Sequence, residues 1–180
     1  MKTWWKLRYC LTALALSYLF VAPAHADKIP GYETLCGFNV VFAPTPTISQ
    51  AVLDERGQPV IVLDPSLSPP DETPRRQFLI MHECAHHRMG HVSAEAISRR
   101  QRSAVYVRDT EMSADCWAAE TLARLGVDRP IEIMALRFHR AGLYSPGGGY
   151  PAGIQRASII RQCAEVGRSF RRTAVDGARQ

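Results

Sequence analysis

Residues 73–90 read TPRRQFLIMHECAHHRMG, and this stretch decides how the rest of the chain is interpreted. Thr73 is a favoured helix N-cap, Pro74 suits the first helical position, and Gly90 is a common residue just past a helix end. The pattern therefore predicts a helix from Pro74 to about Met89. Because residues 78–81 are apolar on every side of such a helix, we expect the helix to be buried.

The predicted helix carries the motif His82-Glu83-x-x-His86. Residues four apart on a helix differ by about 40° around the axis, so both imidazoles project from one face. Two neutral histidine nitrogens held in this way make half of a tetrahedral zinc site. Glu83, about 100° round from His82, can reach a water beside the metal without becoming a ligand. The alternative is a helix whose two histidines only satisfy polar groups of the core.

A second pair of spaced residues supports the first. Glu111 stands 25 residues after His86, and Asp115 follows it four residues later in another predicted helix, so the two carboxylates share a face. One carboxylate can complete a zinc site, and the other can hold a ligand histidine by accepting its remaining ring proton. A solvated acidic face is the alternative. The small or apolar neighbours Ala114 and Trp117 favour a buried role.

His82-Glu83-x-x-His86 followed by Glu111-x-x-Ala114-Asp115 resembles the gluzincin metallopeptidases, and most of all the HtpX-type and prenyl-protein-protease group. The resemblance covers roughly residues 78–120. It implies a zincin-like fold and one zinc ion held by the ligands His82, His86 and Glu111. It also implies that Glu83 is the catalytic base and that Asp115 supports the site.

The resemblance extends to a few further residues. His91 fits a histidine often found at that position, and Pro151-x-x-x-x-Arg156 is similar to a late His-Pro…Arg segment of the family. Tyr150 stands where that segment has its histidine, so no role is carried over to this position. The longer metzincin motif is excluded, because it requires Gly and His where the chain has Met89 and Val92.

Two neighbours of the motif histidines are not expected to bind the metal. Cys84 points about 200° away from His82, toward the back of the helix, which suits a core or disulfide residue. His87 is about 100° from the direction of His86, and we interpret it as a surface residue or a supporting residue of the site.

The remaining pattern predicts an α+β fold, with a small N-terminal sheet and a mostly helical remainder. Strands are expected at residues 38–42, 51–53 and 59–63, the last two forming a hairpin around the polar turn 54–58. Helices are expected at residues 93–101, 106–125, 130–140 and 151–166. Residues 143–150 contain three consecutive glycines and predict a flexible loop, and the basic tail from Arg168 is expected to fray.

The N-terminus predicts export. Residues 1–26 combine a basic start, an apolar run over residues 11–22 and the exit Ala24-His25-Ala26, which is typical of a cleavable signal peptide. A membrane anchor is the alternative, but the run is shorter than the roughly 20 apolar residues of a membrane span. We therefore expect a single mature domain, residues 27–180, in the periplasm or secreted, with no stable membrane anchor.

The net charge of the mature chain is lower than that of the whole chain. The whole chain has a net charge of +5, but the leader holds three basic and no acidic residues, which leaves 19 basic against 17 acidic residues. A mature charge of +2 gives no indication of a nucleic-acid partner.

Four cysteines remain after the leader: Cys36, Cys84, Cys116 and Cys163. An even number of cysteines in an exported chain favours two disulfides over four free thiols. Their pairing is open.

These observations together predict an exported zinc-dependent endopeptidase that acts on a polypeptide substrate. From the resemblance we also expect the strand at residues 59–63 to offer an edge to an extended peptide, and His139, Tyr144 and Tyr150 are the candidates to stabilise the oxyanion. The alternative is a non-hydrolytic zinc-binding protein, such as an envelope assembly or chaperone-like factor. A third possibility is a structural helical domain in which the motif is accidental.

Overall fold

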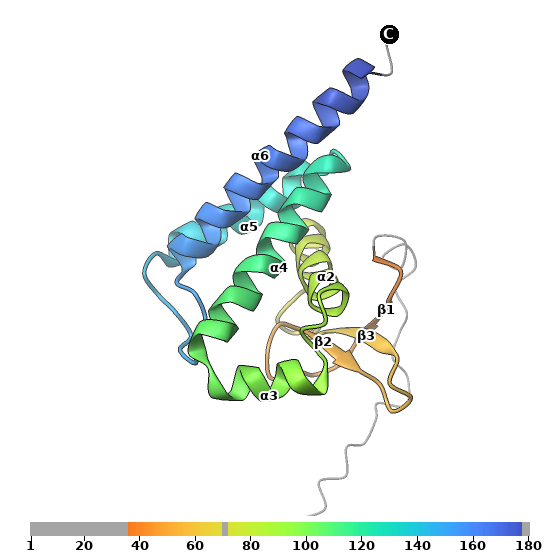
Figure 1. Cartoon of the computed structure of the whole chain (residues 1–180), viewed down its shortest axis with the longest axis vertical. Helices are drawn as coiled ribbons and strands as arrows, with labels where there is room; N and C mark the ends of the chain where they lie inside the picture. Colours follow the sequence, from red (N-terminus) through yellow and green to blue (C-terminus); the bar gives the residue numbers. More distant parts are fainter. Residues whose placement is uncertain (1–35, 70–71, 178–180) are drawn as a thin grey trace, which may run out of the picture.

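The computed structural model describes residues 36–69 and 72–177, and its elements run from three short strands to five helices (Figure 1). The expected α+β class is confirmed. The expected signal peptide, residues 1–26, lies outside the described residues. None of the described helices is long and apolar enough to cross a membrane.

The three strands form one small sheet in the order β1-β3-β2. β1 (Asn39–Phe42) pairs in parallel with β3 (Pro59–Leu63), and β2 (Ser49–Leu53) pairs with β3 in antiparallel register. The hairpin turn is stabilised by the Asp54 carboxylate, which accepts hydrogen bonds from the backbone N–H groups of Arg56 and Gln58. Since β3 is paired on both sides, the expectation that residues 59–63 offer a free edge is wrong. In the order β1-β3-β2, the strand on one edge is β1 and the strand on the other edge is β2.

Five helices follow the sheet in the described part of the chain: α2 (Thr73–Arg88), α3 (Ala94–Arg102), α4 (Ala104–Arg124), α5 (Asp128–Ala141) and α6 (Gly153–Gly177). The first four begin and end within two residues of the predicted bounds. Thr73 is the first helical residue and not the N-cap, whereas Ser93 and Ser103 cap α3 and α4 by accepting hydrogen bonds from Ala96 and Tyr106.

The last helix is longer than the sequence pattern suggested. The tail from Arg168 was expected to fray, but α6 continues to Gly177. Arg168 and Arg171 both reach the Asp128 carboxylate at the start of α5, and Phe170 packs under the guanidinium of Arg124 on α4. These contacts with two other helices explain why the basic segment stays helical.

Helix α2 lies at the centre of the molecule, with the sheet on one side and α4 and α5 on the other (Figure 1). The expected burial of its apolar segment is confirmed, because Phe78, Ile80 and Met81 are almost completely inaccessible to solvent. They share one hydrophobic core with Ile61 of β3 and Leu122 of α4. Helix α2 is thus packed against the sheet, α4 and α5.

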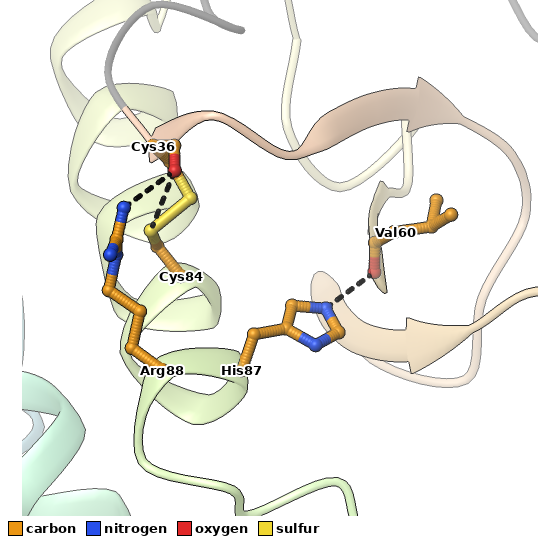
Figure 2. Close-up of a disulfide and its surroundings, with 5 residues drawn as sticks. All are labelled: Cys36, Val60, Cys84, His87 and Arg88. Carbon is orange, nitrogen blue, oxygen red and sulfur yellow. Dashed lines mark hydrogen bonds between the residues drawn. A yellow bond between two sulfur atoms is a disulfide. The ribbon is translucent and has the colours of Figure 1, made fainter. Parts of the chain in front are cut away.

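Two disulfides are present, as expected, and the structure gives their pairing. Cys36 is joined to Cys84, and Cys116 is joined to Cys163. Cys84 lies at the back of α2, where its disulfide holds the chain just before β1, and Arg88 one turn later donates to the Cys36 carbonyl (Figure 2). Two disulfides in a chain of this size indicate a non-reducing, exported environment.

Candidate metal centre

The two motif histidines of α2 point their Nε2 atoms toward a common point. His82 Nε2 and His86 Nε2 are 3.1 Å apart, and both side chains are buried. The arrangement follows from the helical spacing of four residues, which places both rings on the face of α2 that meets α4. The rings stand nearly perpendicular, with an interplanar angle of 77°, so both nitrogens can face one ion.

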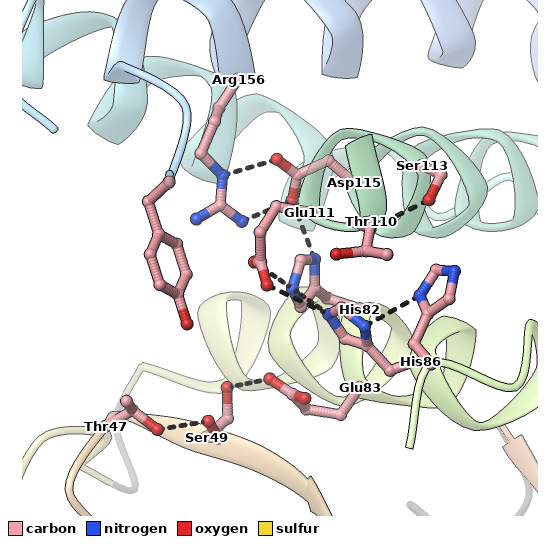
Figure 3. Close-up of polar contacts among 12 residues, drawn as sticks. Thr47, Ser49, His82, Glu83, His86, Thr110, Glu111, Ser113, Asp115 and Arg156 are labelled. Carbon is pink, nitrogen blue, oxygen red and sulfur yellow. Dashed lines mark hydrogen bonds and ion pairs between the residues drawn. The ribbon is translucent and has the colours of Figure 1, made fainter. Parts of the chain in front are cut away.

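Glu111 of α4 completes the cluster from the facing helix (Figure 3). Its Oε2 lies 3.3 Å from His82 Nε2, and its Oε1 lies 3.7 Å from His86 Nε2. In a tetrahedral zinc site with metal–ligand distances of about 2.0–2.1 Å, ligand atoms lie roughly 3.3 Å apart. One ligand atom from each of the three residues lies within 4.8 Å of the other two, so the cluster could hold a metal ion.

Asp115 lies where the spacing placed it, one turn after Glu111 and against His82. The Asp115 Oδ1 atom lies 2.9 Å from His82 Nδ1, so the carboxylate attracts a proton on that nitrogen, while Nε2 of the same ring faces Glu111. Burial opposes a charge on His82, but the carboxylates of Asp115 and Glu111 outweigh burial and raise the pKa of His82 to about 10. Both carboxylates therefore favour the protonated form of the His82 ring.

The position of Asp115 is fixed in turn by Arg156 of α6. Arg156 Nε and Nη2 donate to the two Asp115 oxygens at 2.6 and 2.7 Å, and the guanidinium stacks on Phe138. Asp115 is completely buried, and burial raises its pKa, but Arg156 and His82 reverse this effect and lower the pKa overall. A chain of contacts therefore runs from α6 through α4 to the ligand histidine of α2.

His86 is supported by a different partner. His91, in the turn after α2, places its Nδ1 atom 3.0 Å from His86 Nδ1. Burial lowers the pKa of His86 to about 3, and the neighbouring charge of His82 acts in the same direction. His86 is therefore neutral, which is the form that binds a metal.

The neighbouring His87 takes no part in the cluster. Its Nε2 atom lies 3.0 Å from the Val60 carbonyl oxygen, and its ring packs against Phe38 (Figure 2). Of the two interpretations, the partly exposed position agrees with a surface residue, and the contacts that His87 makes are with the sheet side and not with the cluster. His87 ties the end of α2 to the sheet.

Glu83 points away from the histidines toward β2 (Figure 3). The Ser49 hydroxyl donates to Glu83 Oε1 at 2.7 Å, and the backbone N–H of Ala51 donates to the same carboxylate. Burial raises the pKa of Glu83, although both hydrogen bonds oppose the rise. No local pattern pointed to Ser49, because only the packing of β2 against α2 brings it beside a residue 34 positions away.

Arg100 of α3 is a second residue that sequence reasoning missed. Its Nη2 atom donates to Glu111 Oε1 at 2.6 Å and to the Tyr150 hydroxyl at 2.8 Å, and its Nη1 atom donates to Thr110 Oγ1 at 3.2 Å. In the sequence it is one of several arginines on a polar helix, with nothing to separate it from Arg99.

Of the three candidates for the oxyanion, only Tyr150 is brought to the cluster. Tyr144 is 70% exposed, and His139 is exposed near the end of α5. Tyr150 is delivered by the loop 143–150, in which Gly149 has φ +92° and lies so close to Ala104 that a Cβ would collide with its backbone. Gly149 therefore serves close packing, a different reason for glycine from the flexibility that the sequence suggested.

The fold and the cluster define a class of protein: an α+β protein with two disulfides and a buried candidate metal site. The residues that could hold the metal ion are His82, His86 and Glu111. No protein-family model, curated protein or solved structure matches the chain.

Proposed function

We propose that the protein is an exported zinc-dependent endopeptidase of gluzincin type with a zincin-like fold. One observation carries the proposal: the two spaced motifs meet, so that one ligand atom from each of His82, His86 and Glu111 lies within 4.8 Å of the other two. Two imidazoles and one carboxylate are the protein ligands typical of catalytic zinc in peptidases.

The metal would be held by His82, His86 and Glu111, and a zinc ion there supplies a Lewis acid for the scissile carbonyl and the attacking water. His82 must lose its second ring proton for this purpose, and Asp115 retains the proton on Nδ1. The same arrangement keeps Nε2 aimed at the Glu111 carboxylate.

Glu83 is the proposed general base. Its carboxylate accepts a proton from the water that attacks the carbonyl carbon, and it then donates that proton to the amine nitrogen that leaves. Burial, which raises the pKa of Glu83, makes this carboxylate a stronger base than an exposed one. Ser49 and the Ala51 N–H orient the carboxylate from the adjacent strand.

The open edge of β2 is the proposed docking site for an extended substrate. Along an antiparallel pair of strands, residues that hydrogen-bond to the partner strand alternate with residues that do not. Ile48 is one that does, because its carbonyl accepts from the Asp64 N–H, so the backbone N–H and C=O groups of Ser49 and Ala51 point away from β3. The Ser49 carbonyl instead accepts from Thr47 Oγ1 at 2.7 Å. A peptide that pairs with this edge exchanges the Thr47–Ser49 contact for a backbone hydrogen bond of its own.

Tyr150 is the proposed donor to the developing oxyanion. Its hydroxyl accepts a hydrogen bond from Arg100, which leaves its own proton free to be donated. Arg100 also stacks on the Tyr150 ring, at 5.4 Å from the centroid.

The test is turnover of casein, an unfolded protein substrate, by the exported protein loaded with zinc. Wild type should cleave casein, and Glu83→Gln should retain one zinc per chain while losing turnover by 10²-fold or more, because only the base is removed. Equal turnover by the two proteins would refute the assigned mechanism.

A non-hydrolytic zinc protein remains the second candidate, and one observation favours it. The side chains of His82, His86 and Glu111 are only 5–7% exposed, so the described conformation offers a peptide little access to them. This candidate predicts that wild type and Glu83→Gln bind zinc equally and that neither cleaves casein.

A further inference from the structure

Helix α3 contributes one side chain to the centre. Ala96 is its one buried residue, and Arg99 and Arg102 are exposed. The Arg100 side chain is different, because it is only 27% exposed and turns inward to Glu111. The contact with Glu111 therefore links α3 directly to a proposed metal ligand.

The two oxygens of Glu111 have different partners. Oε1 accepts the short, charge-assisted hydrogen bond from Arg100 at 2.6 Å, and Oε2 faces His82 Nε2 at 3.3 Å. Arg100 is itself fixed by Thr110 and Tyr150, so its guanidinium contacts three groups, two on α4 and one on the loop 143–150. The planar guanidinium can make these contacts at once, whereas a lysine ammonium lacks the fork.

From this arrangement we infer that Arg100 is a positioning residue for the metal ligand Glu111: it holds Oε1 and leaves Oε2 as the single oxygen offered to the metal. The inference rests on the proposed metal site, and it adds how the carboxylate of the third ligand, Glu111, is oriented. A carboxylate can bind a metal through one oxygen or two. A second oxygen would take the position that a catalytic zinc site must keep open for water or substrate.

The variants Arg100→Lys and Arg100→Ala separate geometry from charge. The lysine keeps the positive charge near the metal but loses the fork, and the alanine loses both. Both variants free Oε1, so Glu111 should bind through both oxygens and raise the coordination number. Arg99→Ala is the matched control, because Arg99 lies on the same helix and pairs only with the exposed Glu95. Tyr150→Phe removes one partner that orients Arg100 and should act in the same direction to a smaller extent.

The measurement uses the full exported protein with cobalt(II) in place of zinc, since the visible bands of cobalt(II) weaken as four-coordinate sites become five-coordinate. We expect intense four-coordinate bands for wild type and Arg99→Ala, and a loss of band intensity for Arg100→Lys and Arg100→Ala. Near-ultraviolet circular dichroism of each protein checks that the fold is intact.

Identical spectra for wild type and Arg100→Lys would overturn the inference while leaving the metal site in place. A wild-type protein that binds neither cobalt nor zinc would instead refute the proposed function, so the two failures are distinguishable.

Discussion

At the scale of single residues, the candidate centre is organised by side chains that orient two of the metal donors and the proposed base. Asp115 lies against Nδ1 of His82, and Arg100 binds one of the two carboxylate oxygens of Glu111. Ser49 donates a hydrogen bond to Glu83. Such supporting contacts commonly change metal affinity or activity by about 10–100-fold. Their effects can therefore be measured one residue at a time.

Glu111→Ala and Asp115→Asn should both weaken zinc binding, but by different amounts. Glu111→Ala removes a direct donor and should cost more, whereas Asp115→Asn should cost about 10–100-fold because it only misorients His82. Titration of the metal-free proteins against a chromophoric chelator measures both constants. If Asp115→Asn were the more damaging change, the two assigned roles would be reversed.

Ser49→Ala should lower kcat by about tenfold with little change in KM, since it removes the hydroxyl that holds one oxygen of the proposed base Glu83. Zinc content should not change. Ser49→Thr keeps the hydroxyl that Glu83 accepts from and should restore most of the rate. Wild-type kcat in Ser49→Ala would show that Glu83 does not depend on β2.

At the scale of elements, sequence spacing predicted what a single helix dictates and missed what the packing between elements dictates. The faces of α2 and α4 follow from the helical period, and His82, His86 and Glu111 do lie in one cluster. Asp115 lies against His82, whereas Glu83 turns toward Ser49 of β2. The central place of β3, the length of α6 and the inward turn of Arg100 depend on strand order and on contacts between helices. No local pattern in residues 59–63 or 94–102 encodes them.

The disulfide Cys116–Cys163 joins the same two helices as the Asp115–Arg156 ion pair. Replacing both cysteines by serine should lower the free energy of unfolding by about 2–5 kcal/mol. It should also weaken zinc binding, because Cys116 adjoins Asp115 and Cys163 lies two turns beyond Arg156. Chemical denaturation and zinc titration of the double variant measure the two effects.

The other disulfide provides the matched control for that experiment. Cys36→Ser with Cys84→Ser opens a loop of similar length, with a sequence separation of 48 against 47, on the back of α2. It should destabilise the fold comparably and weaken zinc binding less. A larger loss of zinc affinity from opening Cys36–Cys84 would contradict the coupling through α4 and α6.

At the scale of the whole molecule, the centre joins elements that the chain separates widely. Helices α2 and α4 supply the donors, β2 and α3 hold Glu83 and Glu111, and α6 holds Asp115. A ligand that binds only the folded protein stabilises it by mass action. A metal bound between α2 and α4 should therefore stabilise the fold as a whole.

Removal of zinc by a chelator should lower the melting temperature of the exported protein. At free zinc about 1,000-fold above the dissociation constant, binding adds about 4 kcal/mol. Each kcal/mol corresponds to roughly 2–4 °C for a domain of this size. Scanning calorimetry with and without chelator measures the shift, and Glu111→Ala, which lacks a ligand, should show a much smaller one. A wild-type melting temperature that is unaffected by the chelator would count against a bound metal.

X-ray absorption at the zinc edge of the purified, exported protein tests the central claim most directly, because it identifies the donor atoms without requiring a substrate. The account predicts one zinc per chain with two imidazole nitrogens from His82 and His86 and oxygen donors that include Glu111. A protein without zinc, or a sulfur neighbour at about 2.3 Å that marks a cysteine ligand, would contradict it.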